Sequence, residues 1–403
     1  MAATSPDVLA DDGSGADRRR DAGHLDALTG FRGLSALVVV LVHGSGHTAY
    51  PDIGIRGYGP IALFVLSGYL LVSPWSKWSL GTGSRPDVAT FARRRVARIF
   101  PAYLVCLVVV ALVYPASRPQ DAFSWLRAAT FMSWLRPDGL RPAMEHLWSM
   151  GPEFCWYFVL PLMGTLLWFL GRKAMPQSSL LPILVVLALA TGITTGWLWW
   201  MANGDFTLDQ RLTLPLWLPP YLACFVAGAT VRHLQLASSA PGRGAGMRWL
   251  GQNWWAPALV AAVAVAVLIS PLSGPSGYVS LSWTERNTRT AASLVLALSL
   301  LVATVTSRRD GPFTRLFGWV PLVAVGRWSY GIYLWHLPVT IYMVTNHTVP
   351  TGPVGFVVWI FMLGGVSAIL GALSYRYIEQ PAITWSKGSP AKDSRAKHAP
   401  TKA

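Results

Sequence analysis

Long apolar stretches alternate with short polar segments along most of the chain. Ten of these stretches carry few charges and approach the roughly 20 apolar residues that a transmembrane helix needs. They cover residues 28–44, 58–74, 99–114, 151–170, 180–201, 214–234, 254–271, 288–306, 323–346 and 353–375. The pattern predicts an all-α, polytopic membrane protein with about ten transmembrane helices.

The remaining segments define the expected domain organisation. Residues 1–25 and 382–403 are polar and lack an apolar core, so both are expected to be disordered tails, the second of them basic. Residues 26–381 form the expected membrane domain. The stretch 122–135 is too short to span and contains Arg127, which indicates a re-entrant or interfacial helix.

Composition supports a membrane protein and excludes other classes. Apolar residue types make up 53% of the 403 residues and charged types only 13%, about half the share in ordinary soluble domains. A soluble cytoplasmic enzyme and a disordered chain are both excluded. The 20 Trp suit membrane interfaces. The three Cys lie in apolar stretches, so we expect buried thiols with no disulfide framework and no metal site.

The net charge of +15 has two classes of explanation, nucleic acid or membrane topology. If the N-terminus is cytoplasmic, 22 of the 33 Lys and Arg lie in cytoplasmic segments and 8 in outer loops. This bias predicts that both termini are cytoplasmic. Topology therefore accounts for the basic excess, and no nucleic-acid partner is expected.

Two ionisable residues within the first predicted span are candidate site residues, because charge is costly in a bilayer. Arg32 and His43 are eleven positions apart, which is three helical turns or about 16 Å of rise on one face. Arginine suits a phosphate or carboxylate, and histidine can take a proton from a hydroxyl at neutral pH. The alternatives are snorkelling of Arg32 to headgroups and a merely hydrogen-bonded interfacial His43.

Six sequence blocks in order resemble the membrane acyltransferase-3 family. The first is the Arg-x10-His helix, and the others match family patterns such as LFFxLSGFL, RRxxRIxPxY and HLWSLxxExxFY. These blocks read YGPIALFVLSGYLL (58–71), RRVARIFPAY (94–103), HLWSMGPEFCWY (146–157), GRWSYGIYLWHLP (326–338) and SYRYIEQP (374–381). Many relatives have two adjacent acids after HLWS, whereas here only Glu153 is acidic. This departure places in doubt any mechanism that needs both.

The resemblance implies an enzyme that moves an acyl group, often acetyl, from acyl-CoA to a hydroxyl of a carbohydrate, glycolipid or glycosylated small molecule. It implies that His43 is the general base or, alternatively, carries the acyl group as a covalent acyl-histidine. It also implies that Arg32 holds the donor or stabilises its negative charge, and that Glu153 orients a histidine or binds the acceptor. Acyl-CoA is then a substrate, and no tightly bound cofactor is expected. The implied location is the bacterial plasma membrane, in contact with lipid.

Further candidates lie in the later blocks. Arg94, Arg95 and Arg98 have helical spacing on the predicted cytoplasmic side, where they would bind either the CoA phosphates or anionic lipid. Tyr333 and His336 share a helix face, and His336 would either line a cavity with His43 or make a structural hydrogen bond.

Arg376 and Glu379 are expected to form a structural ion pair. Ser67 and Gly68 are expected to allow close helix packing. The alternative function is a transporter or flippase for a lipid-linked or sugar substrate, although no repeat of two related halves supports it.

Overall fold

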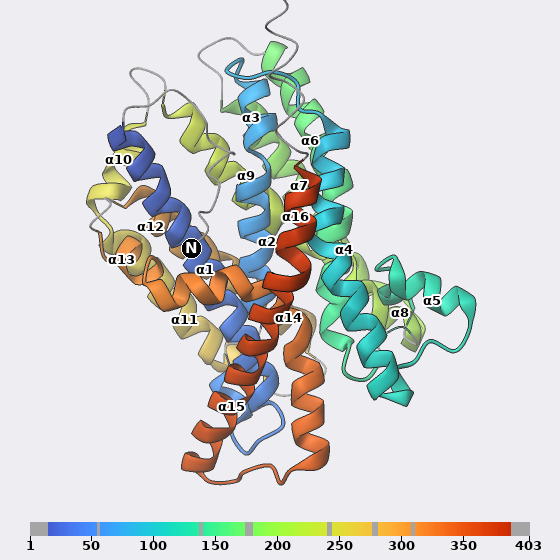
Figure 1. Ribbon diagram of the computed structural model, residues 1–403. Helices are drawn as coiled ribbons and strands as arrows, with labels where there is room; N and C mark the ends of the chain where they lie inside the picture. The colour runs from blue at the N-terminus through green and yellow to red at the C-terminus, as the bar shows by residue number, and fades with distance from the viewer. Residues whose placement is uncertain are drawn as a thin grey trace, which may run out of the picture.

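Helices account for all the regular secondary structure of the residues that the computed structural model describes, which are 15–54, 57–136, 139, 141–173, 180–239, 244–275, 281–307 and 311–387. Figure 1 shows most of the long helices running in roughly the same direction, with α5 projecting to one side. The long helices are α1 (Gly15–Ser45), α2 (Tyr58–Leu71), α4 (Val88–Val113), α6 (Met150–Lys173), α7 (Leu181–Asn203), α9 (Leu222–Ala237), α11 (Trp255–Ile269), α12 (Trp283–Thr306), α14 (Val320–Asn346) and α15 (Pro353–Ser374).

Short helices connect and terminate the long ones. They are α3 (Ser73–Ser79), α5 (Ala122–Ala129), α8 (Leu208–Thr213), α10 (Ala245–Gln252), α13 (Pro312–Phe317) and α16 (Gln380–Ser386). Single turns of 3-10 helix lie at Pro51–Ile53, Pro115–Ser117, Ser133–Leu135, Glu145–Ser149, Leu214–Leu216, Pro219–Tyr221 and Pro271–Ser273. A π-helical turn, Tyr375–Glu379, joins α15 to α16.

The all-α membrane architecture predicted from the sequence is confirmed. Within the described residues, 7 helices are long and apolar enough to cross a membrane, or up to 9 if each of two bent pairs is one span. The bent pairs are Leu208–Leu216 with Pro219–Ala237 and Ala245–Gln252 with Trp255–Ile269. The ninth predicted stretch, 323–346, forms α14, which is 27 residues long and includes Arg327 and His336; it is not among these helices. Ten crossings and cytoplasmic termini stay predictions.

The two tails lie mostly outside the described residues. Helix α1 begins at Gly15, so its backbone continues into the segment expected to be a disordered tail. At the other end, α16 extends to Ser386, inside the predicted tail 382–403. Residues 1–14 and 388–403 are outside the described part of the chain.

Large apolar side chains cover the outside of the bundle. Leu162, Ile269 and Phe361 are 71%, 73% and 76% exposed on long helices. In water a surface of this kind would associate or aggregate, but against lipid hydrocarbon it is the expected surface of a transmembrane helix. Polar residues are instead enclosed between helices, where they can form a site.

Glycines bring the backbones of key helices into contact, as is typical of membrane bundles. Helix α1 packs closely on α14, where a Cβ on Gly326 would lie 1.9 Å from the carbonyl oxygen of Thr29. Helix α2 packs in the same way on α9, where a Cβ on Gly68 would lie 1.8 Å from the carbonyl oxygen of Phe225. The close packing expected at Gly68 is confirmed, and these crossings fix the helices that carry the polar residues.

Candidate active site

A cavity of about 650 Å³ lies between α1, α2, α3, α4, α6 and α14. Its apolar wall comes largely from α2, with Leu63, Phe64 and Leu66, while its polar wall comes from α1, α4 and α6. A volume of this size lies within the range of cavities that hold small molecules and cofactors. The cavity is therefore the first place to look for a bound substrate.

Four arginines line this cavity. Arg32 comes from α1, and Arg94, Arg95 and Arg98 come from the first part of α4. Within the described residues, no hydrogen bond or ion pair links Arg32, Arg94 or Arg98 to another side chain. The guanidinium of Arg95 lies over the Phe91 ring, 5.8 Å from its centroid. These guanidinium groups can therefore donate hydrogen bonds to an anionic ligand.

Glu153, in the first turn of α6, is the acidic group on the inner cavity wall. Its Oε1 accepts one hydrogen bond from Ser67 Oγ and one from Tyr157 OH, each 2.8 Å long. Two hydroxyl donors on one oxygen fix the carboxylate in place. The hydrogen bonds occupy Oε1, while the cavity arginines provide the nearby positive charge.

Asp87, just before α4, also lines the cavity. The Thr90 hydroxyl and the backbone N–H groups of Ala89 and Thr90 donate hydrogen bonds to its carboxylate, which lowers its pKa below the ordinary value. Asp87 is thus the N-cap of α4. The charged cap starts the helix at the point that brings the three α4 arginines onto the cavity.

Tyr333 and Ser149 close another part of the cavity wall. Their hydroxyl groups are 2.8 Å apart, and the Tyr333 hydroxyl also donates to the backbone carbonyl of His146. This hydrogen bonding ties α14 to the turn before α6. Tyr333 lines the cavity, and its ring also lies beside the rings of His146 and His336.

The histidine cluster consists of His43 on α1, His146 before α6 and His336 on α14. His336 Nε2 lies 3.0 Å from His43 Nδ1, and the two ring centroids are 4.9 Å apart. The His146 ring packs edge-on against His336 at 4.8 Å. His146 and His336 are buried, whereas His43 is half-buried. Three segments distant in sequence thus meet at one group of imidazoles.

The structure places the predicted residues in two connected groups. Six of them line the cavity, namely Arg32, Arg94, Arg95, Arg98, Glu153 and Tyr333. His43 and His336 are not part of that wall; they contact each other and are joined to the cavity through Tyr333. Of the two alternatives for His336, the hydrogen bond between helices is the one observed.

Several polar contacts were not anticipated from the sequence. Ser67, expected only to permit close packing, donates to Glu153, and Tyr157 does so from the next turn of α6. Glu153 and Tyr157 are four residues apart, a spacing that places two side chains on the same face of a helix and could have predicted this contact. The contact between Ser149 and Tyr333 had no signal in the sequence, because the residues are 184 positions apart.

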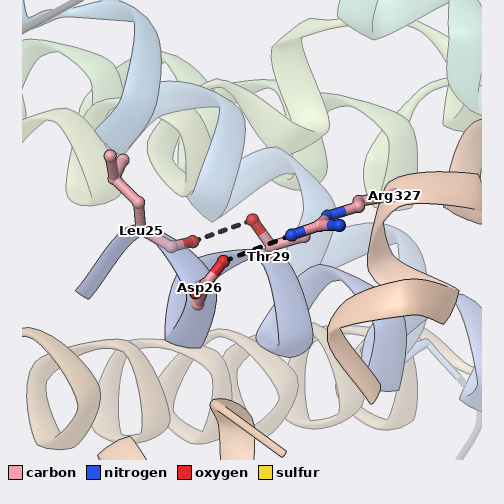
Figure 2. A network of polar contacts seen from close by, with 4 residues as sticks. All are labelled: Leu25, Asp26, Thr29 and Arg327. Atoms are coloured by element: carbon pink, nitrogen blue, oxygen red, sulfur yellow. Dashed lines mark hydrogen bonds and ion pairs between the residues drawn. The ribbon is translucent and has the colours of Figure 1, made fainter. Parts of the chain in front are cut away.

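Of two further pairs of oppositely charged residues, only one forms an ion pair in the described part of the chain. Figure 2 shows Arg327 of α14 reaching Asp26 of α1, with their charged atoms 3.7 Å apart at a half-exposed surface. The expected pair of Arg376 and Glu379 is wrong. Glu379 instead accepts a hydrogen bond from Ser374, and Arg376 lies over the Tyr377 ring, because the π-helical turn changes the spacing of these side chains.

Comparison with known proteins gives the following similarities. The family profile described as "Acyltransferase domain" matches residues 25–377. O-acetyltransferase OatA of Staphylococcus aureus is 22% identical over 390 residues, which cover 89% of this chain and 57% of that protein. Peptidoglycan O-acetyltransferase OatA of Listeria monocytogenes is 26% identical, with 89% and 56% covered.

A relative of more similar length is Acyltransferase MdmB of Streptomyces mycarofaciens, which is 26% identical with 89% of this chain and 92% of that protein covered. The chain thus spans little more than half the length of the OatA proteins. No solved structure matches this chain.

Proposed function

The chain belongs to the acyltransferase family, and from this premise we propose that it is an integral-membrane O-acyltransferase. It moves an acyl group, such as acetyl, from acyl-CoA to a hydroxyl of a carbohydrate, glycolipid or glycosylated small molecule. The observation that carries the proposal is the cavity whose wall combines unpaired guanidinium groups with an apolar surface.

The chemistry of the cavity suits an acyl-CoA donor. Coenzyme A carries several phosphate charges at one end and a neutral, flexible pantetheine arm at the other. Arg94 and Arg98 offer phosphate-binding groups on α4, and Leu63 and Phe64 offer an apolar surface to the arm. Because Arg94 is exposed, the phosphates bind at that end and the thioester points inward.

His43 acts as the general base in this proposal. Its ring takes the proton of the acceptor hydroxyl as the oxygen attacks the thioester carbonyl. The carbon–sulfur bond then breaks, the thiolate of coenzyme A leaves, and the imidazolium returns the proton to it. Arg32 on the same helix balances the negative charge that develops on the donor.

The thioester has to pass one layer of side chains to reach His43. Ser149 and Tyr333 line the cavity, and His336 contacts Tyr333 through a hydrogen bond from its Nδ1 to the Tyr333 carbonyl. A shift of the Tyr333 ring, whose hydroxyl is held by Ser149 and the His146 carbonyl, opens this route. The acceptor approaches the part of the His43 ring that is not buried between the helices.

Acceptor class and location follow from the relatives by analogy. Two matched proteins are named O-acetyltransferases, one of them acting on peptidoglycan. We therefore place this enzyme in the bacterial plasma membrane, modifying a hydroxyl of a cell-envelope glycan or a related glycosylated molecule.

The decisive test is acyl transfer by His43→Ala and by a matched control, His47→Ala. Membranes containing each protein at equal level receive labelled acetyl-CoA with cell-envelope glycans or a glycosylated small molecule. We expect His43→Ala to lower transfer at least 100-fold, since general base catalysis typically contributes about 10²–10⁴-fold, while His47→Ala stays near the original rate. Full transfer by His43→Ala rules out this base, and movement of the glycan without acylation favours a transporter.

A further inference from the structure

His43 and His336 make a direct hydrogen bond between two helices that are far apart in the sequence. His43 lies in the last turn of α1 and His336 near the middle of α14, with Nδ1 of the first 3.0 Å from Nε2 of the second. A hydrogen bond between two imidazoles needs one nitrogen with a proton and one without. The backbone carbonyl groups beside each ring show which nitrogen carries the proton.

The tautomer of His336 follows from its own backbone. Its Nδ1 lies 2.7 Å from the carbonyl oxygen of Tyr333. A carbonyl only accepts hydrogen bonds, so Nδ1 carries the proton. The side chain is fully buried, where an uncompensated cation is costly. His336 is therefore neutral, and its Nε2 is an acceptor.

The tautomer of His43 then follows from two independent contacts. His336 Nε2 requires a donor, and His43 Nδ1 is the atom that faces it. The same Nδ1 lies 3.1 Å from the carbonyl oxygen of Val39, which also only accepts. Both contacts place the proton on His43 Nδ1. In the neutral ring, Nε2 then carries the lone pair.

We infer that His336 is a positioning residue that sets the tautomer and orientation of His43, so that His43 Nε2 is the basic nitrogen of the acyl transfer. This inference rests on the proposed role of His43. When Nε2 takes the hydroxyl proton, the ring becomes a cation and its Nδ1–H donates more strongly to His336. The arrangement gives His336 the part that a carboxylate has in a catalytic triad.

The rest of the cluster supports a positioning role. His146 packs edge-on against the His336 ring, and the Tyr333 carbonyl accepts from His336 Nδ1, so a ring contact and a hydrogen bond both fix the His336 side chain. Within the described residues, no three His, Cys, Asp or Glu side chains are placed to hold a metal ion. The contacts of His336 are those of a hydrogen-bond acceptor that orients His43.

The test compares His336→Gln with His336→Asn. The glutamine amide occupies roughly the position of Nε2 and can accept from His43. The shorter asparagine amide occupies that of Nδ1, so His43 Nδ1 keeps the Val39 carbonyl on its own helix as an acceptor but loses the contact that orients its ring toward α14. We expect His336→Asn to lower kcat about 10–100-fold, and His336→Gln to recover most of the loss. KM for acetyl-CoA should stay unchanged in both, because the donor cavity does not include His336.

Three outcomes are distinguishable. If His43→Ala is inactive but His336→Asn has the original kcat, His336 does not position the base and the inference is overturned. The inference is also overturned if His336→Gln and His336→Asn are folded and equally impaired. If His43→Ala is fully active, the proposed function of His43 fails as well. For variants that do not fold, histidine ¹⁵N NMR of the original protein decides: a proton on His43 Nδ1 that is hydrogen-bonded to an unprotonated His336 Nε2 supports the inference, and a protonated His336 Nε2 or an unprotonated His43 Nδ1 overturns it.

Discussion

At the scale of single residues, the cavity is defined by an excess of arginine over acid. Arg32, Arg94 and Arg98 have no hydrogen-bond or ion-pair partner among the described residues, whereas the Glu153 carboxylate is already held by two hydroxyl groups. Unpaired cations at a partly enclosed wall are costly unless an anion joins them. Glu153 and Glu379 attract Arg32, Arg95 and Arg98 from beyond hydrogen-bond distance, but the four arginines outnumber these two acids, and the remaining positive charge favours an anionic ligand.

Arg98→Gln tests whether this ligand is the phosphate part of the donor. Loss of one charge-assisted hydrogen bond is worth about 1.5–3 kcal/mol, so KM for acetyl-CoA should rise roughly 10–100-fold with a smaller change in kcat. Arg93→Gln, on the same helix but outside the cavity wall, should leave KM near its original value.

S-acetylpantetheine gives an internal check on the same variant, because it keeps the thioester and lacks the phosphates. The original protein and Arg98→Gln should use this donor equally well. A matching loss with both donors would show that Arg98 supports the fold or the chemistry and does not bind phosphate.

At the scale of elements, the contact of α1 with α14 sets the site geometry. Helix α1 carries Arg32 and His43, and α14 carries Tyr333 and His336. Their backbones approach at Gly326, where no side chain fits. The exposed pair of Asp26 and Arg327 at the same crossing contributes at most about 1 kcal/mol. Close packing, and not this ion pair, holds the two helices together.

Gly326→Ala should separate the two helices and weaken the site. Its Cβ would lie 1.9 Å from the Thr29 carbonyl oxygen, and overpacking of this kind costs about 1–3 kcal/mol. We expect a lower Tm in detergent and reduced acyl transfer. Gly365→Ala on α15, whose Cβ would meet nothing within 4 Å, is the control and should be neutral or slightly stabilising. Equal Tm for both variants would contradict this account.

At the scale of the whole molecule, the arginines and the histidines lie at successive depths of one bundle. The basic end of the cavity includes Arg94, close to the N-terminal end of α4, and His43 lies in the last turn of α1. The Lys and Arg distribution predicts that residues 75–98 are cytoplasmic and that the segment after α1 is outside. Donor and acceptor would then approach from opposite sides.

Cysteine labelling tests this orientation. Ser84→Cys and Ala49→Cys are both at exposed positions, and Cys155→Ser removes the half-buried native thiol. With a membrane-impermeant maleimide on intact cells, Ala49→Cys should be labelled, and Ser84→Cys only after permeabilisation. The reverse pattern would place the basic end of the cavity outside the cell and exclude donor binding from the cytoplasm.

The class of the protein and most of the polar candidates could be read from the amino-acid sequence alone. Apolar stretches of membrane length and costly intramembrane charges are local properties, so all-α membrane helices and Arg32 could be predicted from composition and spacing, whereas Glu153 was a candidate through the family resemblance. The Arg94, Arg95 and Arg98 cluster was equally visible, because one helix carries all three.

The contacts between distant residues depend on the packing of the folded helices. His43 and His336 are 293 positions apart, and Ser149 and Tyr333 are 184 apart, so no local pattern could pair them. The π-helical turn at Tyr375–Glu379 likewise altered a spacing that an ideal helix would have kept. Helix contacts through glycine brought these distant residues together. The same packing placed His43 and His336 outside the wall of the cavity that the arginines line.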